Sequence, residues 1–293
     1  MEKVVVAVFL AAFMLQAGLG CDFRDLLAAL RNRNCMIRVV LANFVVVPLI
    51  GVLAVRVFAL DDFVAVGILL MAIAPGVPFL PMLAGTKNGG DEGLATALAV
   101  LLPAISIVTV PIMAPLVLPV NAEAHIVLAS FIVNLLALQL LPLIIGLYIR
   151  QRAPSTAPTL IKACMAVVAV ALLVVLVALA PRMGAAFVAL YGSRGLLAAL
   201  LIVVLSAGTG WLFGGSEARY RNTMTLSTIM RNFGLALLVT GQNFAGTIAS
   251  PTVLTYFVIQ LVVANLLAQA LKRQQSLGAP ISHSAHAQSA SKE

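Results

Sequence analysis

The stretch FVAVGILLMAIAPGVPFLPMLAG, residues 63–85, is apolar along its whole length, yet its second half contains three prolines spaced three residues apart. Pro75, Pro78 and Pro81 each lack a backbone N–H, and each ring clashes with the preceding turn of a helix. With Gly76 among them, they predict a membrane-spanning segment that is split by unwound backbone, whereas a single proline would favour an ordinary kink. Such backbone is tolerated at membrane depth only where protein or a watery cavity satisfies it. The stretch therefore predicts a functional site as well as a fold.

The composition identifies an integral membrane protein. Of the 293 residues, 62% are hydrophobic and 10% are charged, whereas soluble domains carry about 25% charged residues. Apolar runs of roughly 20 residues recur without the alternation of a barrel strand, so the spanning elements are expected to be helices. The formal charge of +8 reflects basic residues sorted to one side of a lipid bilayer. We expect no nucleic acid partner.

Nine apolar segments predict an all-α polytopic fold with nine transmembrane helices. The expected spans are residues 3–20, 37–57, 63–86, 93–117, 124–149, 159–180, 195–214, 222–243 and 250–271. Twelve Lys and Arg residues fall in one set of loops and four in the other, which places the N-terminus outside and the C-terminus in the cytoplasm of a bacterial-type inner membrane. Residues 276–293 are expected to be a disordered cytoplasmic tail.

The first apolar segment has a competing interpretation. The run from Val4 to Cys21 also resembles a secretory or lipoprotein signal peptide. Cleavage there would leave Arg24, Arg31 and Arg33 on the translocated side, against the positive-inside rule. A retained span is the preferred interpretation.

A second interrupted span contains STIMRNFGLALL, residues 227–238. It places Arg231 near the middle of the predicted span 222–243, directly followed by Asn232 and shortly by Gly234. The two interrupted spans are five apart in order, which suggests two related halves. Paired interrupted helices at corresponding positions indicate the substrate site of a transporter.

At these segments the sequence resembles the bile acid:sodium symporter family, over about residues 3–272. Three motifs carry the resemblance: Asn43-Phe44-Val45-Val46-Val47-Pro48, Pro75-Gly76 followed by Gly90-Asp91, and Arg231-Asn232-Phe233-Gly234-Leu235-Ala236. Nine spans with an external N-terminus are similar to the nine-helix form of the family.

The resemblance implies an inverted-repeat transporter with two crossing broken helices, in a transmembrane domain over residues 1–275. The panel domain would contain the spans near 3–20, 124–149 and 159–180, and the core domain the other six. Family members carry organic anions, usually driven by sodium, in a crevice between the two domains. The positions implied for substrate binding are Arg231, Asn232, Pro75, Gly76 and Gln260.

The chain departs from the family at its sodium sites. The family's ion-binding positions fall here on Asn43, Leu80, Pro81, Ser227 and Arg231, which keep few side-chain oxygens. Independently of the resemblance, all ten carboxylates fall at termini, loops or span ends, whereas coupled carriers need ionisable groups in the pathway. We therefore expect no metal or cofactor and no standard sodium coupling. Sodium bound by backbone carbonyls and the remaining amides is the alternative.

Arg231 then has three interpretations. It is a structural cation satisfied by carbonyls, a permanent replacement for the sodium ion, or a partner for an anionic substrate. The function expected is secondary transport of a small organic anion by alternating access. A sodium-coupled symporter and a non-transporting ligand-binding receptor are the alternatives. An enzyme is not expected, because no membrane-depth carboxylate pair, His cluster or metal motif is present. The sequence leaves the substrate and the oligomeric state open.

Overall fold

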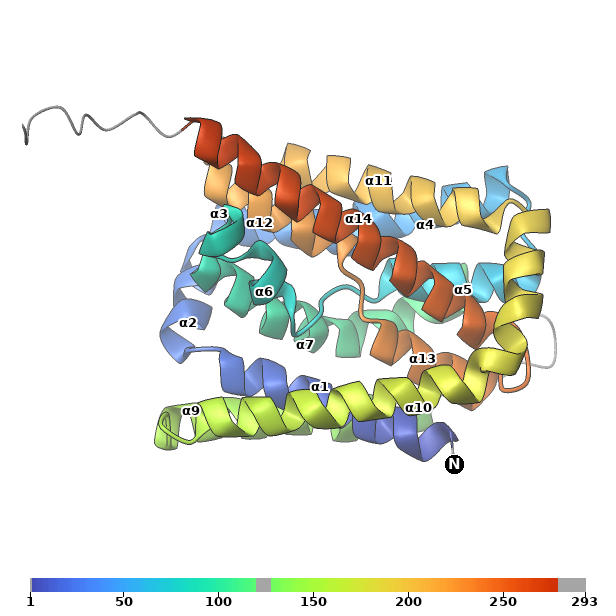
Figure 1. Cartoon of the computed structure of the whole chain (residues 1–293), viewed down its shortest axis with the longest axis horizontal. Coiled ribbons are helices and arrows are strands. Elements are labelled where there is room, and N and C mark those ends of the chain that lie inside the picture. Colours follow the sequence, from blue (N-terminus) through green and yellow to red (C-terminus); the bar gives the residue numbers. More distant parts are fainter. Residues whose placement is uncertain (1, 120–127, 279–293) are drawn as a thin grey trace, which may run out of the picture.

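The computed structural model describes residues 2–119 and 128–278, which fold almost entirely into helices (Figure 1). Within these two ranges, the only paired extended backbone is one bridge between Pro75 and Arg231. The predicted all-α fold class is confirmed. In chain order the elements are α1 (Glu2–Gly20), α2 (Phe23–Arg31), α3 (Arg33–Leu41), the π-helical η1 (Ala42–Val46), α4 (Val47–Val57), α5 (Asp62–Ile73), α6 (Leu80–Ala84), the 3-10 turn η2 (Thr86–Asn88), α7 (Glu92–Val117), α8 (Leu128–Leu135), the π-helical η3 (Leu136–Leu140), α9 (Leu141–Arg152), α10 (Ala157–Gly192), α11 (Gly195–Phe213), α12 (Ala218–Ile229), α13 (Phe233–Asn243) and α14 (Ala249–Gly278).

Among the described residues, seven helical segments are long and apolar enough to cross a membrane: α1, residues 33–57, α7, residues 131–152, α10, α11 and α14. The other two predicted spans, 63–86 and 222–243, are each divided into two shorter helices, α5 and α6 in one case and α12 and α13 in the other. The count of nine crossings stays a prediction, because neither divided segment contains a single helix of crossing length.

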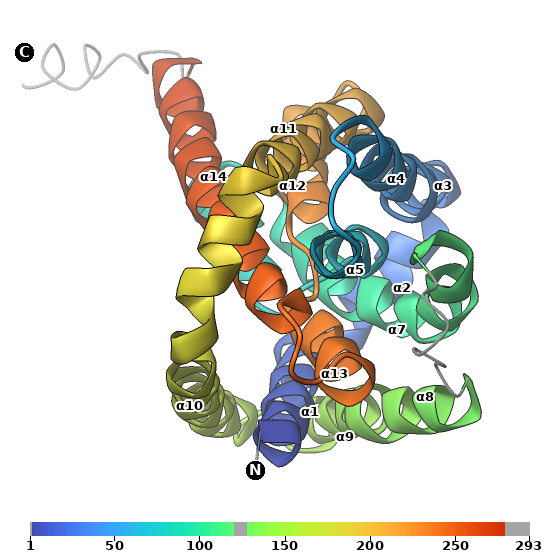
Figure 2. The same ribbon diagram turned by 90° about the vertical axis from the view of Figure 1, so that its right-hand side faces the viewer.

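The helices form two groups that meet near the second break. α1 packs along both α9 and α10, and these three lie together on one side of the molecule (Figures 1 and 2). α4, α11, α12 and α14 lie toward the opposite side, and α5 packs against α4 and α14. α13 contacts both α1 and α14, so it joins the two groups.

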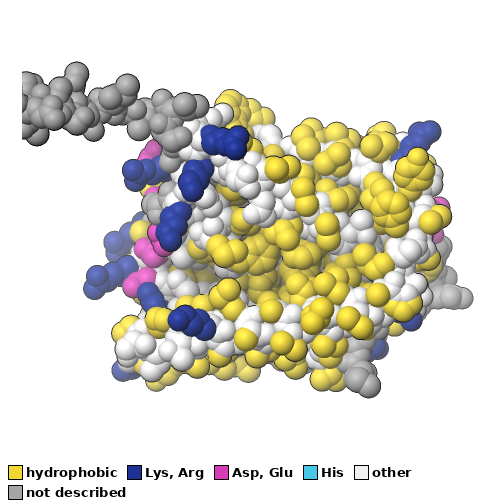
Figure 3. Space-filling model, in the orientation of Figure 1, with side chains coloured by type: hydrophobic (Ala, Val, Ile, Leu, Met, Phe, Trp, Pro, Cys, Tyr) yellow, Lys and Arg dark blue, Asp and Glu magenta, His cyan; other side chains and the backbone are white. Residues whose placement is uncertain are grey.

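The surface has the form expected of a membrane protein. Exposed apolar side chains cover the middle of the molecule, and Lys and Arg gather at the end where α2 and the last turns of α9 and α14 lie (Figure 3). The sorting of basic loops along the sequence is thus matched by their gathering at one end of the fold.

The helix α10 is longer than predicted. The expected span ended at residue 180, but the helix continues through Pro181 to Gly192. Its 36 residues correspond to about 54 Å, which exceeds a hydrocarbon core of about 30 Å. The last part of the α10 ribbon turns toward α11 (Figure 2). One proline bends a helix without ending it when good helix formers follow, and this part of α10 connects the two groups of helices.

Two further predictions are corrected, and one lies partly outside the structure. Residues 23–31, expected to be loop, form the amphipathic helix α2, which begins where the side chain of Asp22 accepts a hydrogen bond of 2.9 Å from the Arg24 N–H. The predicted tail begins inside α14, which runs to Gly278. Residues 279–293 of that tail and residues 124–127 of the predicted fifth span lie outside the described residues.

Candidate functional site

The two breaks lie against each other and satisfy each other's backbone. The Gly76 N–H donates to the Met230 carbonyl at 3.2 Å, and the Asn232 N–H donates to the Ala74 carbonyl at 2.7 Å. Groups that a continuous helix would have paired internally are thus paired across the crossing, as non-helical backbone at membrane depth requires. The crossing of the two interrupted segments, with Pro75 opposite Arg231, is the centre of the candidate site.

Gly76 is required by the geometry of the first break. Its φ is +92°, in the left-handed region, and a Cβ there would lie 2.6 Å from Pro103 Cδ and 2.7 Å from Leu102 Cβ. Only glycine fits both the backbone conformation and the close approach to α7. Gly76 therefore shapes the site as backbone and offers no side chain to a substrate.

Arg231 is fully buried at the second break. Its side-chain Nη1 donates to the backbone carbonyl of Asn43 at 3.4 Å. Within the described part of the chain, its Nε and Nη2 have no hydrogen-bond partner. The Tyr256 hydroxyl and Asn232 Nδ2 are likewise buried without a partner. The Asn43 Oδ1 acceptor is also buried without a partner, so the unpaired donors of the site outnumber its unpaired acceptors.

The Asn43 carbonyl has no N–H donor within its own helix, and the local sequence explains why. In the π-helical turn η1, the Val47 N–H donates to the Ala42 carbonyl, five residues back. The next donor along the chain would be residue 48, which is a proline without an N–H. The carbonyl of Asn43 is thus left without a helical partner and contacts Arg231, while its side-chain amide donates to Val39 at 3.1 Å.

Gln260 holds Arg231 in place from α14. Its Oε1 accepts from the Arg231 N–H at 3.1 Å, and its Nε2 donates to the Arg231 carbonyl at 3.2 Å. Both polar atoms of this fully buried side chain are therefore used on the backbone of the break. Predicted as a substrate-binding position, Gln260 acts in this conformation as a positioning residue.

The other predicted ion-site positions do not converge on an oxygen cage. Leu80 is buried and Pro81 half-buried in the short helix α6. The Ser227 hydroxyl donates to the Met224 carbonyl in its own helix at 2.8 Å. Of the five positions, the structure brings together Asn43 and Arg231, through a backbone carbonyl rather than through the Asn43 amide.

An aromatic cluster, which the sequence analysis missed, surrounds the start of α13. Phe233 lies 5.1 Å from Phe9 and 3.8 Å from Phe257 between ring centroids, and Phe13 contacts Phe79 at 5.7 Å. Phe9 and Phe13 come from α1, so this cluster joins the two groups of helices beside the crossing. Their spacing of four residues in an apolar helix was the available signal, since such residues share one helix face.

Two polar contacts also join the groups. Asn134 Nδ2 donates to Gln242 Oε1 at 3.2 Å. The buried Gln139 Nε2 donates to the Pro103 carbonyl and, at 3.0 Å, to Ser106 Oγ. They hold α8 against α13 and η3 against α7 in this conformation.

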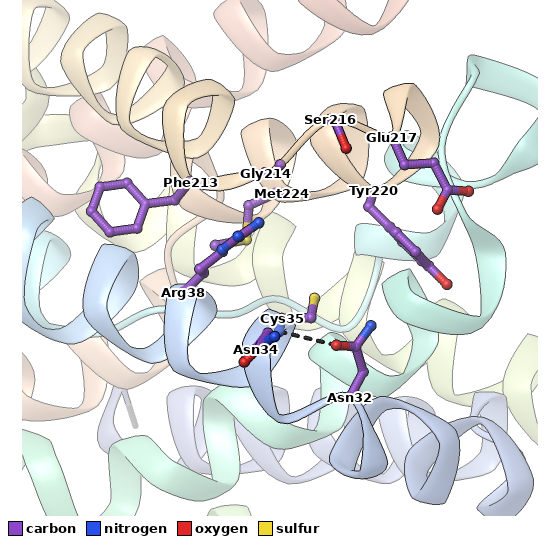
Figure 4. Close-up of a pocket in the computed structure, with 11 residues that line it drawn as sticks. Asn32, Asn34, Cys35, Arg38, Phe213, Gly214, Ser216, Glu217, Tyr220 and Met224 are labelled. Carbon is purple, nitrogen blue, oxygen red and sulfur yellow. Dashed lines mark hydrogen bonds between the residues drawn. The ribbon is translucent and has the colours of Figure 1, made fainter.

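A cavity of about 250 Å³ opens at the basic end of the molecule, between α3 and the start of α12 (Figure 4). Arg38, Glu217 and Tyr220 line it, and Met224 lies at its inner part. Tyr220, Met224 and Ser227 are spaced four and three residues apart, so they lie on one face of α12. Helix α12 ends at Ile229, and Arg231 follows in the unwound backbone of the second break.

A neighbouring cavity of about 310 Å³ is lined by two carboxylates, Asp25 of α2 and Asp91 before α7. A Cβ on Gly93 would lie 3.3 Å from Asp25 Oδ1 and 3.6 Å from Asp91 Oδ1, so both carboxylates lie over the first turn of α7. Burial raises the pKa of the Asp25 carboxyl, and the charges of Asp22, Asp91 and Glu92 raise this pKa further.

The raised pKa of the Asp25 carboxyl predicts that Asp25→Asn stabilises the protein at neutral pH. A pKa that is raised in the folded state means that the ionised carboxylate opposes folding, and this penalty disappears as the pH falls below the ordinary value. We expect a higher midpoint of thermal unfolding for Asp25→Asn at pH 7 and little difference near pH 3. Arg24→Gln, on the same helix, is the control. A lower midpoint of thermal unfolding for Asp25→Asn than for the wild type at pH 7 would contradict the raised pKa of Asp25.

Comparison with known proteins gives two findings. The sequence model of the sodium bile acid symporter family matches residues 7–191, which include the first break and end before Arg231. The probable sodium/metabolite cotransporter BASS1, chloroplastic, of Arabidopsis thaliana is 23% identical over 265 residues, or 89% of this chain. The chain spans 65% of the length of that relative.

Proposed function

We propose, since this chain belongs to the sodium bile acid symporter family, that it is a secondary transporter of a small organic anion that works without the family's standard sodium sites. Family membership and the distant relative indicate a transporter of a metabolite. The anion, of the bile-acid-like, sulfated or carboxylated amphipathic kind, crosses by alternating access.

The proposal assigns the two groups of helices to two domains. α1, the segment from α8 to α9, and α10 form the panel, and the remaining crossing segments form the core. With α5–α6 and α12–α13 each counted as one interrupted crossing, the chain crosses the membrane nine times. The basic end with α2 faces the cytoplasm of a bacterial-type inner membrane, and the N-terminus lies outside.

The observation that carries the proposal is the contact of the Arg231 guanidinium with the freed carbonyl of Asn43. Two positions that correspond to ion-site residues of the family are here joined by a fixed cation and a backbone oxygen. Carbonyl oxygens are what a hard cation such as sodium would use. Arg231 thus supplies the positive charge that links α12–α13 to η1, and its unpaired Nε and Nη2 are available to the substrate anion.

Transport is tested in proteoliposomes that are preloaded with an unlabelled anion and assayed for uptake of the same labelled anion. The probes are taurocholate, estrone sulfate and pyruvate, which represent a bile acid, a steroid sulfate and a keto acid. We expect at least one to stabilise the purified protein against heat and to enter faster than into protein-free vesicles. Stabilisation without flux would indicate a receptor instead. The absence of both stabilisation and uptake would contradict organic anion transport.

The proposed orientation predicts the labelling of Cys35. This residue is half-buried and lines both cavities at the basic end, whereas Cys21 and Cys164 are buried. A membrane-impermeant maleimide should label Cys35 in inside-out vesicles and not in intact cells, and Cys35→Ser should remove the signal. Labelling of Cys35 in intact cells would show that the basic end lies outside and would contradict the proposed orientation.

A further inference from the structure

The charge of Arg231 cannot leave the site in the way that an ion can. The guanidinium stays protonated at any physiological pH and is fully buried. No described carboxylate is hydrogen-bonded to it; its recorded partner is the Asn43 carbonyl, and Nε and Nη2 are unpaired. The site therefore keeps one positive charge through every step of transport.

The same residue is pinned to three parts of the fold. Its side chain contacts η1, its N–H and carbonyl are both bound by Gln260 of α14, and the adjacent Asn232 N–H pairs with Ala74 of the first break. Arg231 and its neighbour thus connect η1, α14 and the first break by hydrogen bonds. The residue that supplies the charge is therefore tied to the crossing through its backbone as well as through its side chain.

In any ion-coupled symporter, the carrier that holds the ion but no substrate must not reorient, because its movement would dissipate the ion gradient. The carrier returns instead after both the ion and the substrate have left. A bound group changes a conformational equilibrium only through its different affinity for the two states, and here the cation is a covalent part of the chain and cannot dissociate from either state. This protein therefore has no form without the positive charge that could return across the membrane without a substrate.

Resting on the function proposed above, we propose that this carrier reorients only with an organic anion bound and is therefore an anion exchanger. An incoming carboxylate or sulfate pairs with the unpaired Nε and Nη2 of Arg231, for which bidentate geometry is suited. The Tyr256 hydroxyl and Asn232 Nδ2, both buried without a partner in the described structure, are further donors for it. The anion neutralises the site, the loaded core moves, and a second anion brings it back.

The test compares labelled anion uptake into preloaded and empty proteoliposomes, without sodium on either side. The probe is whichever of taurocholate, estrone sulfate and pyruvate enters preloaded vesicles fastest. We expect the initial rate in preloaded vesicles to exceed that in empty vesicles by about tenfold or more. Equal rates in both would overturn the exchange mechanism and leave the transport function standing. No uptake into preloaded vesicles would remove the transport function itself.

Two variants separate the role of the charge from that of the fold. Arg231→Lys keeps a cation and should keep the stimulation by internal anion. Arg231→Gln should lose that stimulation in sodium medium. Sodium would then supply the positive charge and could dissociate, so the carrier could return without an anion. Loss of the stimulation in Arg231→Lys, with uptake itself intact, would contradict the proposal even if the glutamine variant does not fold.

Discussion

Arg231→Gln is expected to make the protein sodium-sensitive. In the wild type, the buried guanidinium occupies the space beside the Asn43 carbonyl, so a sodium ion would meet a like charge there. Glutamine removes the charge and adds a carbonyl oxygen, which together with the Asn43 carbonyl gives the kind of ligands that a hard cation takes. At a sodium concentration about ten times the dissociation constant, binding would stabilise the variant by about 1.4 kcal/mol.

The measurement is thermal unfolding of both proteins in sodium chloride and in choline chloride, with and without taurocholate, estrone sulfate and pyruvate. The wild type should show no difference between the two salts, and Arg231→Lys, as the charge-preserving control, should behave in the same way. Arg231→Gln should unfold at a higher temperature in sodium. Loss of stabilisation by the anions, with no effect of sodium, would instead identify Arg231 as a substrate contact alone.

Gly76→Ala is expected to abolish transport. The left-handed φ of +92° costs a residue with a Cβ about 1–2 kcal/mol. The overlap of this Cβ with Pro103 and Leu102, at 2.6 and 2.7 Å, adds about 1–3 kcal/mol of overpacking. Because Gly76 N–H also pairs with Met230, any backbone movement that relieves the clash separates the two breaks.

The effect of Gly76→Ala is measured by thermal unfolding and by uptake into preloaded proteoliposomes. The matched control is Gly241→Ala, since a Cβ on Gly241 meets no atom within 4 Å and alanine favours a helix such as α13. The control should retain stability and uptake. A Gly76→Ala variant with the stability and the uptake rate of the control would show that the close packing of the break against α7 is not required.

Local sequence predicted the first break because its cause is local. Three prolines spaced three apart with Gly76 leave no helical turn intact, and the structure ends α5 at Ile73 and begins α6 at Leu80. Helix α7 also contains three prolines, Pro103, Pro111 and Pro115, and remains continuous. There each proline is separated by at least a full turn from the next, so proline spacing, and not proline number, decides between a kink and a break.

What the sequence left unpredicted depends on contacts between distant residues. Gln260 is one of several amides in apolar helices, and only the fold shows that both of its polar atoms are bonded to Arg231. The aromatic cluster likewise combines α1 with α13 and α14. The family resemblance places Asn43 at one of the ion-site positions, but a π-helical turn before Pro48 makes its backbone carbonyl, and not its side-chain amide, the partner of Arg231.

The central claim is that Arg231 stands in for a transported ion. Its most direct test is the initial rate of labelled anion uptake into preloaded wild-type proteoliposomes, with sodium on both sides or with choline replacing it on both sides. Equal rates in the two media are the predicted result. An absolute requirement for sodium would contradict the claim and favour a symporter that binds sodium through backbone carbonyls and the remaining amides.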